Sequence, residues 1–336
     1  MATLRWGIAS AGQIAHDFAT AMHTLPAKEH KIIAVAAQQL SRAQAFATLH
    51  KIPKAFDDYE KLALDKEIDI VYIGTLHPQH FDIAMMMLKH NKHILCEKPL
   101  TMNLKQATEL INYARSKKLF LMEAVWSRCF PAYDAVRKEL ASGNIGDVHQ
   151  VIASLGFRFP HVDRITKKEL GGGTILDLGI YCLQFACLVY GNEMPESIKA
   201  SGVVNENGVD MSMSATLFYK GDRTATIMSH GLVTLPNEAY ICGTKGMIKL
   251  PTFWCPTTVE LPNETVKQFS LPESNQEIQF KLKNSVGLSY EAAEARECIL
   301  KGLIESPKVT HETSLLLARL EDEIRRQLGV VYPQDT

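Results

Sequence analysis

The sequence has no excess of charge of either sign. Its 36 lysine and arginine residues stand against 37 aspartate and glutamate residues, and the net charge is -1. This balance provides no general attraction to nucleic acid or to anionic lipid. We therefore expect a small-molecule substrate, no nucleic-acid partner and no membrane partner.

Long hydrophobic runs and paired cysteines are also scarce. No apolar stretch looks long enough to cross a bilayer, and the opening residues enter a strand pattern without a leader-like segment. The seven cysteines are odd in number, scattered, and include no CxxC pair. They predict reduced thiols and a cytosolic location. His77 and His80 are spaced like a metal-binding pair, but Pro78 between them argues against a helix, so no metal site is expected.

What the chain does contain is an alternation of apolar runs and amphipathic segments. A chain of 336 residues is too long for a single hydrophobic core of ordinary size, which predicts two domains. Continuous apolar strands alternating with helices indicate an α/β domain over residues 1–124 with a doubly wound parallel sheet. The predicted strands are 4–9, 32–37, 68–74, 93–96 and 119–124, and the predicted helices are 12–25, 41–50, 79–91 and 103–117.

The rhythm changes in the second domain, predicted over residues 125–336. Consecutive strands without intervening helices indicate an α+β domain whose large sheet is mostly antiparallel and open on one face. A long apolar helix is expected in GGGTILDLGIYCLQFACLVYG, and further helices at 131–142, 289–302 and 311–328. The predicted strands are 147–157, 197–204, 211–219, 223–231, 238–243 and 246–250.

A small-residue turn follows the first predicted strand. Gly12 takes the central position of a dinucleotide fingerprint, Ala15 the third, and Ser10 replaces the usual first glycine. Such a turn lets backbone amides at a helix start approach a pyrophosphate. Ser10, Gly12, Gln13 and Ile14 are therefore candidate cofactor-binding residues of a Rossmann domain.

The end of the second predicted strand carries no acidic residue. An acid there would bind the adenosine ribose 2′-hydroxyl of NAD and repel the 2′-phosphate of NADP. Gln38 follows the strand, and Ser41 and Arg42 stand at the next helix start, where hydroxyl, guanidinium and backbone amides suit a phosphate. This favours NADP, although Ser41 could simply be a helix cap and Arg42 a solvated side chain.

The tetrapeptide CEKP ends the apolar run at residues 93–96. At the carboxyl end of a sheet strand, Glu97 and Lys98 would lie at the cofactor crevice, with Lys98 able to bind the nicotinamide ribose. Pro99 would fix the backbone, and a cis Lys–Pro bond is possible. The alternative is a surface ion pair at a strand end.

Three polar residues interrupt the long apolar helix. Asp177, Tyr181 and Gln184 are spaced to share one face, which is costly on a buried helix unless the face lines a site. A tyrosinate can remove the hydroxyl proton during alcohol oxidation if a nearby ammonium lowers its pKa. We expect Lys98 to acidify Tyr181, and Asp177 to orient Lys98 or bind a neighbouring substrate hydroxyl. An isolated tyrosine would instead be a core anchor.

These motifs together resemble the glucose-fructose oxidoreductase / inositol dehydrogenase family. The resemblance rests on the Ser-Ala-Gly turn, HPQH, CEKP and GGGTILDLGIY, with SYEA at 289–292 and the ending VYPQD. Many members carry histidine where this chain has Tyr181. The resemblance implies NADP-linked oxidation of trans-dihydrodiols of aromatic hydrocarbons and of aldopyranoses such as D-xylose, by a cytosolic homodimer formed through the open sheet.

The resemblance also implies individual roles. Lys98 and Tyr181 match the family's catalytic pair, and Asp177 its aspartate. His77 and His80 match a loop near the nicotinamide ribose, although a structural role as capping histidines stays open. Further positions match a substrate pocket or depart from the pattern: Trp126 and Trp254 match aromatic pocket positions, Gln38 replaces a basic residue near the 2′-phosphate, and Leu155 replaces an aromatic pocket wall.

Two other functions are compatible with the motifs. A general sugar or inositol oxidoreductase of the same family is one, and Tyr181 in place of histidine weighs against it. A non-catalytic NADP-binding regulator is the other, and the joint presence of Lys98, Asp177 and Tyr181 weighs against that.

Overall fold

The computed structural model describes residues 3–274 and 278–336. The chain divides into two compact units, and each is gathered from separate segments. The first unit comprises Met1–Leu100, Gln106–Trp126 and Leu271–His311, and the second comprises Thr101–Lys105, Ser127–Ser270 and Glu312–Thr336. The predicted boundary after residue 124 lies close to the end of the first unit's main body. All residues beyond this boundary were predicted to form one domain, but Leu271–His311 belong to the first unit.

The first unit contains a six-stranded sheet whose neighbouring strands all pair in parallel. The strand order β3-β2-β1-β4-β5-β6 is that of a doubly wound fold, so the predicted fold class is confirmed. Apolar runs form these strands because helices cover both faces of the sheet. The strands are β1 (Leu4–Ala9), β2 (His30–Ala36), β3 (Lys54–Phe56), β4 (Ile70–Ile73), β5 (His93–Glu97) and β6 (Leu121–Ala124).

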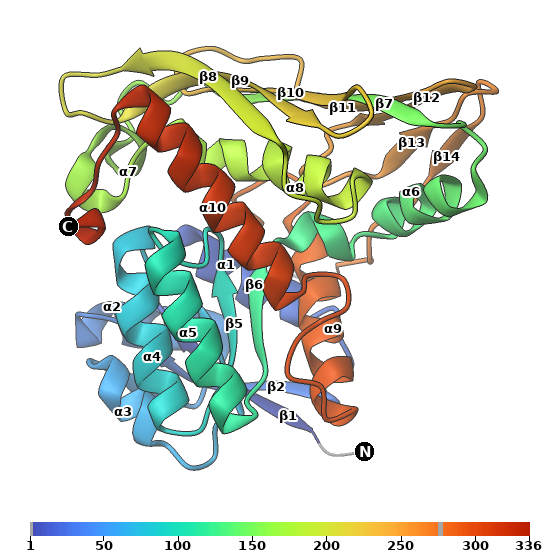
Figure 1. The fold of residues 1–336 in the computed structure, drawn as a ribbon. Coiled ribbons are helices and arrows are strands. Elements are labelled where there is room, and N and C mark those ends of the chain that lie inside the picture. Colours follow the sequence, from blue (N-terminus) through green and yellow to red (C-terminus); the bar gives the residue numbers. More distant parts are fainter. Residues whose placement is uncertain (1–2, 275–277) are drawn as a thin grey trace. The chain divides into compact units, whose positions relative to one another are not determined.

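Helices connect successive strands, and one further helix comes from far along the chain. Figure 1 shows α4 and α5 side by side over one face of the sheet. On the α1 side, the late helix α9 packs against α1, and the buried Asp17 of α1 accepts the backbone amides of Lys281 and Leu282 at 2.7 and 2.8 Å. The helices are α1 (Gln13–Met22), α2 (Leu40–His50), α3 (Tyr59–Leu64), η1 (His77–Gln79), α4 (His80–Lys89), α5 (Leu104–Lys117), η5 (Ser285–Gly287) and α9 (Leu288–Leu300).

The second unit contains an eight-stranded sheet in the order β14-β13-β12-β11-β7-β10-β9-β8. Its neighbouring strands pair antiparallel except β7 and β10, which are parallel, so the expected mostly antiparallel sheet is confirmed. The strands are β7 (Val148–Gly156), β8 (Ser197–Val204), β9 (Asp210–Tyr219), β10 (Arg223–His230), β11 (Glu238–Gly243), β12 (Gly246–Pro251), β13 (Thr258–Glu260) and β14 (Val266–Gln268).

The helices of the second unit lie on one side of this sheet. In Figure 1 α6, α8 and α10 run beneath the strands, and among the described residues no helix crosses the opposite face. Ile152 and Phe218 are exposed on that open face. The helices are η2 (Trp126–Cys129), which joins the units, α6 (Pro131–Ser142), α7 (Asp163–Thr166), η3 (Lys168–Leu170), η4 (Ile175–Gly179), α8 (Ile180–Val189), α10 (His311–Leu328) and η6 (Pro333–Asp335).

The long apolar helix differs from its prediction. Three glycines form a turn, η4 is a π-helix, and only Ile180–Val189 is α-helical. The expectation that no stretch could span a membrane is also wrong by length and composition, since Lys168–Val189 has a mean hydropathy of 1.5. Its most apolar window is 89% buried inside the fold, as in the core helix of a globular domain. The short elements β3, α3, β13 and β14 were not predicted.

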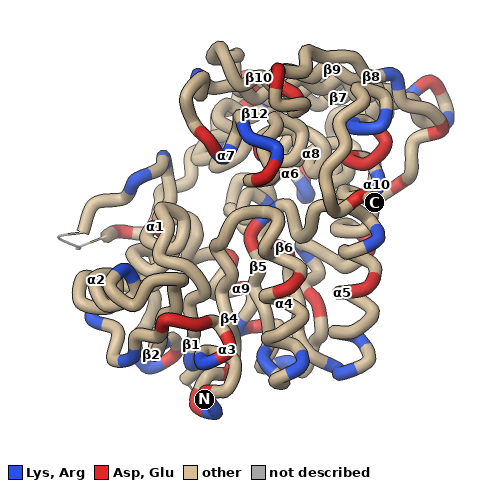
Figure 2. Tube along the Cα trace, turned by 90° about the vertical axis from the view of Figure 1, so that its left-hand side faces the viewer, with Lys and Arg blue, Asp and Glu red and all other residues tan. Residues whose placement is uncertain are grey.

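Charged residues follow no single-sign pattern along the chain. Figure 2 shows lysine and arginine interspersed with aspartate and glutamate along both units. All seven cysteines are free thiols, as predicted, and six of them are buried. No group of three or more potential ligands that could hold a metal ion occurs within residues 3–274 and 278–336.

Candidate active site

The turn between β1 and α1 has the geometry of an anion-binding helix start. Gly12 is the N-cap of α1, no side chain caps this end, and no acid stands in its first turn. Ser10, at the place of the usual first glycine, takes φ +120°, a value that favours glycine. Its hydroxyl compensates in part by accepting the Gly12 amide at 3.0 Å. The exposed amides near Gln13 and Ile14 therefore fit a dinucleotide pyrophosphate.

The end of β2 likewise presents no acid. Gln38, Ser41 and Arg42 are exposed there, at the beginning of α2. The N-cap of α2 is Gln39, which makes no capping hydrogen bond, so the alternative interpretation of Ser41 as the helix cap is wrong. Because side chains leave this helix start uncapped, its amides and Arg42 fit an added phosphate.

The CEKP segment is anchored on both sides by side chains of the first unit. Lys98 is half-buried, and the Lys98–Pro99 peptide bond is cis, as the sequence allowed. The buried His80 contacts the Pro99 carbonyl through Nδ1 at 2.8 Å, and Glu123 accepts the Leu100 amide at 2.8 Å. These contacts fix the backbone that carries Lys98 at the carboxyl end of β5.

Glu97 belongs to a buried polar cluster. The Tyr72 hydroxyl donates to its Oε1 at 2.6 Å, and burial raises the pKa of Tyr72, which keeps the phenol neutral. Glu291 of α9 is 0% exposed, and neither of its carboxyl oxygens has a hydrogen-bond partner among the described residues. Burial, and then the charge of Glu97, raise the pKa of Glu291 well above its ordinary value. The sequence interpretation missed Tyr72, and it noted the segment around Glu291 only as a resemblance.

The two histidines of HPQH differ in their surroundings. His80 is fully buried, and its second ring nitrogen lies 3.2 Å from the Thr75 carbonyl. Burial lowers the pKa of His80. Its two ring nitrogens contact the Pro99 and Thr75 carbonyls, and its side chain caps neither η1 nor α4. His77 is partly exposed, and its ring centroid lies 5.8 Å from that of His80.

In the second unit, a glycine turn leads into the helix that bears Asp177 and Tyr181. A Cβ on Gly172 would lie 2.6 Å from the Ile165 carbonyl, so the turn can pack against α7 only without a side chain. Gly173 has φ +116°. Beyond it, the buried Asp210 accepts the Thr174 hydroxyl and the Ile175 amide at 2.7 and 2.8 Å. The glycine run of the sequence thus fixes where η4 begins.

Arg164 lies beside the predicted catalytic residues. It donates to Asp177 Oδ1 at 2.8 Å, and the Asp177 side chain is 6% exposed. Asp177, and to a smaller extent Tyr181, raise the pKa of Arg164, which places the guanidinium within electrostatic reach of both. Tyr181 is 8% exposed. The second unit therefore supplies its own cation, bound to Asp177, which the sequence interpretation missed because Arg164 stands in a short polar segment without a motif.

Gln184 does not share the role expected from its spacing. Its Oε1 accepts from Arg128 at 3.0 Å, and its amide donates to the Tyr133 hydroxyl at 2.6 Å, all within the buried core. The prediction of a three-residue polar face is wrong for Gln184. A π-helix has a wider turn than an α-helix, so the α-helical spacing does not extend through η4.

Aromatic side chains gather around Trp254. Phe157, just beyond β7, meets its ring edge-on with centroids 5.3 Å apart, and both are partly exposed. Leu155 is fully buried in the core and presents no wall to a ligand. Phe157 was missed by the sequence interpretation, although it lies only two residues further along the strand pattern. Trp126, 6% exposed, ends the first unit.

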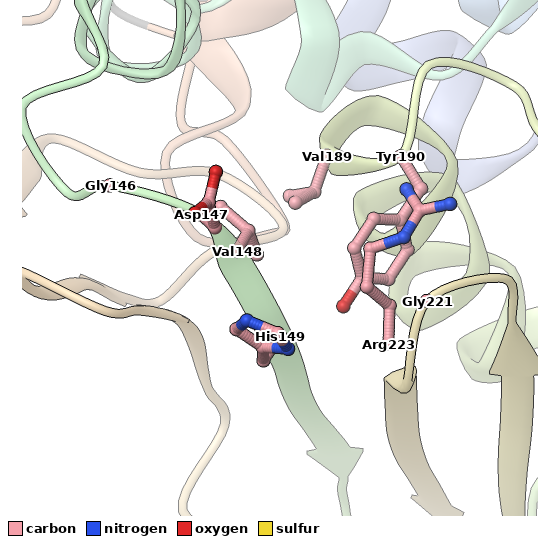
Figure 3. Close-up of a pocket in the computed structure, with 8 residues that line it drawn as sticks. All are labelled: Gly146, Asp147, Val148, His149, Val189, Tyr190, Gly221 and Arg223. Carbon is pink, nitrogen blue, oxygen red and sulfur yellow. The ribbon is translucent and has the colours of Figure 1, made fainter.

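A cavity of about 450 Å³ opens elsewhere in the second unit (Figure 3). Its lining includes His149, Tyr190 and Arg223. The Tyr190 hydroxyl donates to the Thr224 carbonyl at the start of β10, whereas Thr174 contacts Ser229 near the end of β10. The cavity therefore lies at the far end of α8 from Asp177 and is not part of the candidate site.

Comparison with known proteins identifies the fold family. Residues 4–125 match the family model described as an oxidoreductase family with an NAD-binding Rossmann fold, and residues 133–249 match the GFO/IDH/MocA C-terminal domain. The chain belongs to the GFO/IDH/MocA oxidoreductase family. This confirms the family predicted from the CEKP and glycine-turn motifs.

Within the GFO/IDH/MocA family, several curated relatives match the chain over nearly their whole length. The trans-1,2-dihydrobenzene-1,2-diol dehydrogenase of Danio rerio is 48% identical over 334 residues, covering 99% of both chains. The protein of the same name in Homo sapiens is 44% identical over 333 residues, again covering 99% of both. The chain is an NAD(P)-dependent dehydrogenase that acts on CH–OH groups, as predicted.

A solved member of the family shares the architecture. KijD10, a 3-ketoreductase from Actinomadura kijaniata in complex with NADP and TDP-benzene, is 25% identical, has a TM-score of 0.80, and covers 97% of this chain and 98% of its own. A variant of that reductase with tyrosine replaced by phenylalanine has been solved with the same two ligands.

Proposed function

We propose that the chain oxidises trans-dihydrodiols of aromatic hydrocarbons and aldopyranoses such as D-xylose with NADP, using Tyr181 as general base. The observation that carries this proposal is the buried Tyr181 one helical turn beyond the ion-paired Asp177, with Arg164 in electrostatic reach. The positive charge of Arg164 would favour the Tyr181 phenolate, against the opposing effects of burial and of the Asp177 carboxylate. The names of the full-length relatives support the dihydrodiol substrate.

In the proposed reaction the substrate hydroxyl gives its proton to the Tyr181 phenolate as the carbinol hydrogen leaves as hydride. Bound NADP would supply the hydride acceptor. Lys98 would bind the nicotinamide ribose and favour ionisation of Tyr181, with His77, His80 and Glu97 forming or holding the same loop. Asp177, kept ionised by Arg164, would accept a hydrogen bond from the neighbouring substrate hydroxyl. Each role uses a residue type suited to it.

The preference for NADP over NAD rests on the end of β2. No acid stands there to bind a ribose 2′-hydroxyl, and Arg42 is exposed beside an uncapped helix start. A 2′-phosphate would gain both charge attraction and amide hydrogen bonds at this position. With Gln38 in place of a second cation, Arg42 provides the main charge.

The aromatic pair Phe157 and Trp254 supports a flat, apolar ring as part of the substrate. Partly exposed aromatic faces in the second unit offer the packing that an aromatic dihydrodiol requires, and aldopyranoses also pack their apolar faces on such rings. Trp126 is proposed as a further substrate-binding residue. The buried Leu155 no longer weighs against aromatic substrates.

A homodimer and a cytosolic location complete the proposal. The open face of the second sheet carries Tyr240, Ile152, Thr226 and Thr216 in one row across four strands, with no charge among them. Lys249 and Lys199 flank this row on the neighbouring strands, and a sheet face with a neutral centre and a charged margin suits a second copy of the chain. The seven free thiols are consistent with a reducing compartment.

The test is turnover of a substrate panel with each cofactor. We expect reduced nicotinamide to form from D-xylose and trans-1,2-dihydrobenzene-1,2-diol with NADP, faster than with NAD and faster than from myo-inositol. Tyr181→Phe should abolish turnover, whereas Tyr190→Phe, a buried tyrosine at the far end of α8, should retain it. Preference for inositol would favour the general sugar oxidoreductase. Cofactor binding without turnover of any substrate would favour a non-catalytic regulator.

A further inference from the structure

The carboxyl-terminal residues form a compact polar assembly that we call the C-terminal clasp: Arg325, Tyr332, Pro333, Gln334 and Asp335. Arg325 is 3% exposed and donates to Asp335 Oδ2 at 2.7 Å. Its guanidinium carbon lies 5.0 Å from the centre of the Tyr332 ring. The Tyr332 amide in turn donates to Asp335 at 2.9 Å. A buried guanidinium is costly unless its donors are used. Both terminal nitrogens of Arg325 donate, whereas its Nε has no hydrogen-bond partner among the described residues.

One side of the clasp holds the glycine turn before the catalytic helix. The Tyr332 hydroxyl donates to the Gly172 carbonyl. The Cβ position of Gly173 lies 2.8 Å from that hydroxyl oxygen and 2.5 Å from Asp210 Oδ1. Asp210 also binds Thr174 and Ile175, so the clasp and Asp210 enclose the backbone directly before η4. Asp177 follows two residues after Ile175.

The other side of the clasp holds the chain that leaves the CEKP segment. Arg325 donates to the Met102 carbonyl at 3.1 Å. The Asn103 side chain donates to the Gln334 carbonyl at 2.8 Å and to Asp335 at 3.1 Å. Met102 is only four residues beyond Lys98, and all of these contacts lie within the second unit.

An apolar cluster completes the assembly. Met102, Leu176, Val330 and Tyr332 pack in one buried group together with Ile165 of α7. Leu176 directly precedes Asp177, and Ile165 directly follows Arg164. The same group therefore supports both members of the Arg164–Asp177 ion pair and the last residues of the chain.

We propose that the C-terminal clasp positions Asp177 and Tyr181 for hydride transfer, with Tyr332 as the residue that transmits this constraint to the glycine turn. This inference rests on the proposed function. Tyr332 would not touch the substrate; it is a positioning residue. Displacement of a reacting group by a fraction of an ångström slows transfer strongly, so loss of the Tyr332 hydroxyl should lower kcat while binding of the cofactor is retained.

The experiment compares Tyr332→Phe with Tyr190→Phe in the full-length protein. Both tyrosines are buried, and the hydroxyl of each donates a hydrogen bond to a backbone carbonyl of the second unit. Both substitutions remove that hydroxyl. Only Tyr332 contacts the glycine turn. We expect Tyr332→Phe to lower kcat for D-xylose with NADP about tenfold or more and to raise the primary deuterium isotope effect. The KM for NADP should stay unchanged, and Tyr190→Phe should alter neither kcat nor the isotope effect.

A second measurement is independent of activity. Amide hydrogen exchange over residues 171–181 should quicken in Tyr332→Phe and not in Tyr190→Phe. Equal exchange in both variants, or an equal loss of kcat in both, would overturn the inference. If wild type has no turnover but amide exchange over residues 171–181 is still faster in Tyr332→Phe, the proposed function fails. The conclusion that Tyr332 holds the glycine turn then stands. If Tyr332→Phe does not fold, Asn103→Ser takes its place, because it removes the contacts of Asn103 with Gln334 and Asp335 on the other side of the clasp. It should also lower kcat and quicken amide exchange over residues 171–181.

Discussion

The Arg164 guanidinium lies 2.8 Å from the Asp177 carboxylate, and the pKa of Arg164 is raised by Asp177 and, to a smaller extent, by Tyr181. The aspartate is almost fully buried, whereas the arginine side chain is 45% exposed. The pair thus joins a buried carboxylate to a partly exposed guanidinium within the second unit. From the sequence, only Lys98 was considered as the cation that acts on Tyr181, so the charge of Arg164 was omitted.

Replacement of this cation should change the pH dependence of turnover. Arg164→Gln removes the positive charge that favours the Tyr181 phenolate, so the pKa of the base rises and the acid limb of the kcat/KM profile moves up by about one pH unit or more. Lys167→Gln is the matched control, because it removes an exposed ion pair with Asp163 on the same short segment. A profile that shifts equally in both variants would contradict the assignment.

The glycine turn should tolerate no side chain at residue 173. Gly173→Ala adds a Cβ at φ +116° that meets Asp210 Oδ1 at 2.5 Å, so we expect a loss of about 3 kcal/mol in unfolding free energy. Gly143→Ala is the control, since Gly143 also has a positive φ but nothing within 4 Å of its Cβ position. Its cost should be about 1 kcal/mol, from backbone strain alone. Urea unfolding followed by circular dichroism measures both.

Glu291 should make the fold less stable as pH rises. Its folded pKa is raised above the ordinary 4.5, so between these two values the folded state holds a proton that the unfolded state releases. Stability therefore falls with increasing pH across that window, by up to about 1.4 kcal/mol per pH unit. Glu291→Gln removes this dependence, and its melting temperature should exceed that of wild type by a margin that grows above pH 4.5.

The control for this measurement is Glu297→Gln, an exposed position on the same helix that pairs with Lys301. Thermal scans at several pH values would compare the three proteins. A constant difference between Glu291→Gln and wild type at every pH would show that Glu291 is ionised in the folded state.

Cofactor preference should depend on Arg42. Arg42→Ala is expected to raise the KM for NADP about tenfold, the equivalent of one charge-assisted phosphate contact, and to leave the KM for NAD unchanged. Lys51→Ala, at the other end of α2, removes a cation from the same helix and should affect neither cofactor. Parallel changes with both cofactors would place the 2′-phosphate elsewhere.

Association should depend on the open face of the second sheet. Ile152 is 36% exposed at the centre of its uncharged row, and Ile152→Asp would place a charge in a self-complementary contact. We expect light scattering coupled to size exclusion to give a dimer for wild type and a monomer for the variant. Leu49→Asp, an exposed leucine of the first unit, is the control, and a monomeric wild type would end the dimer proposal.

Periodicity in the sequence predicted most of the fold because strong patterns leave little choice. The strand Leu4–Ala9 and the helices Pro131–Ser142 and His311–Leu328 have the predicted limits, as do two strands of the second sheet, Ser197–Val204 and Glu238–Gly243. Each is a long apolar or amphipathic run ended by turn residues. Strands of three residues, such as Lys54–Phe56, carry too few residues for a pattern to emerge.

The candidate site was harder to predict because its geometry depends on pairs distant in sequence. Nothing near Glu97 in the sequence points to Glu291, and the two meet electrostatically only because α9 returns to the first unit. The π-helix at Ile175–Gly179 is invisible in an apolar run, since a wider turn changes no residue type. The shared face predicted for Asp177 and Gln184 failed for that reason.

The interleaving of segments has a consequence for how this chain can be made. The first unit takes α9 from residues 271–311, and the second needs residues 312–336 as well as the five residues after Leu100. A ribosome must therefore synthesise the chain as far as residue 311 before the first unit has all its parts, and beyond it for the second, so neither can mature early in translation. Cutting the gene near codon 126 would yield two fragments that each lack structural elements of their unit.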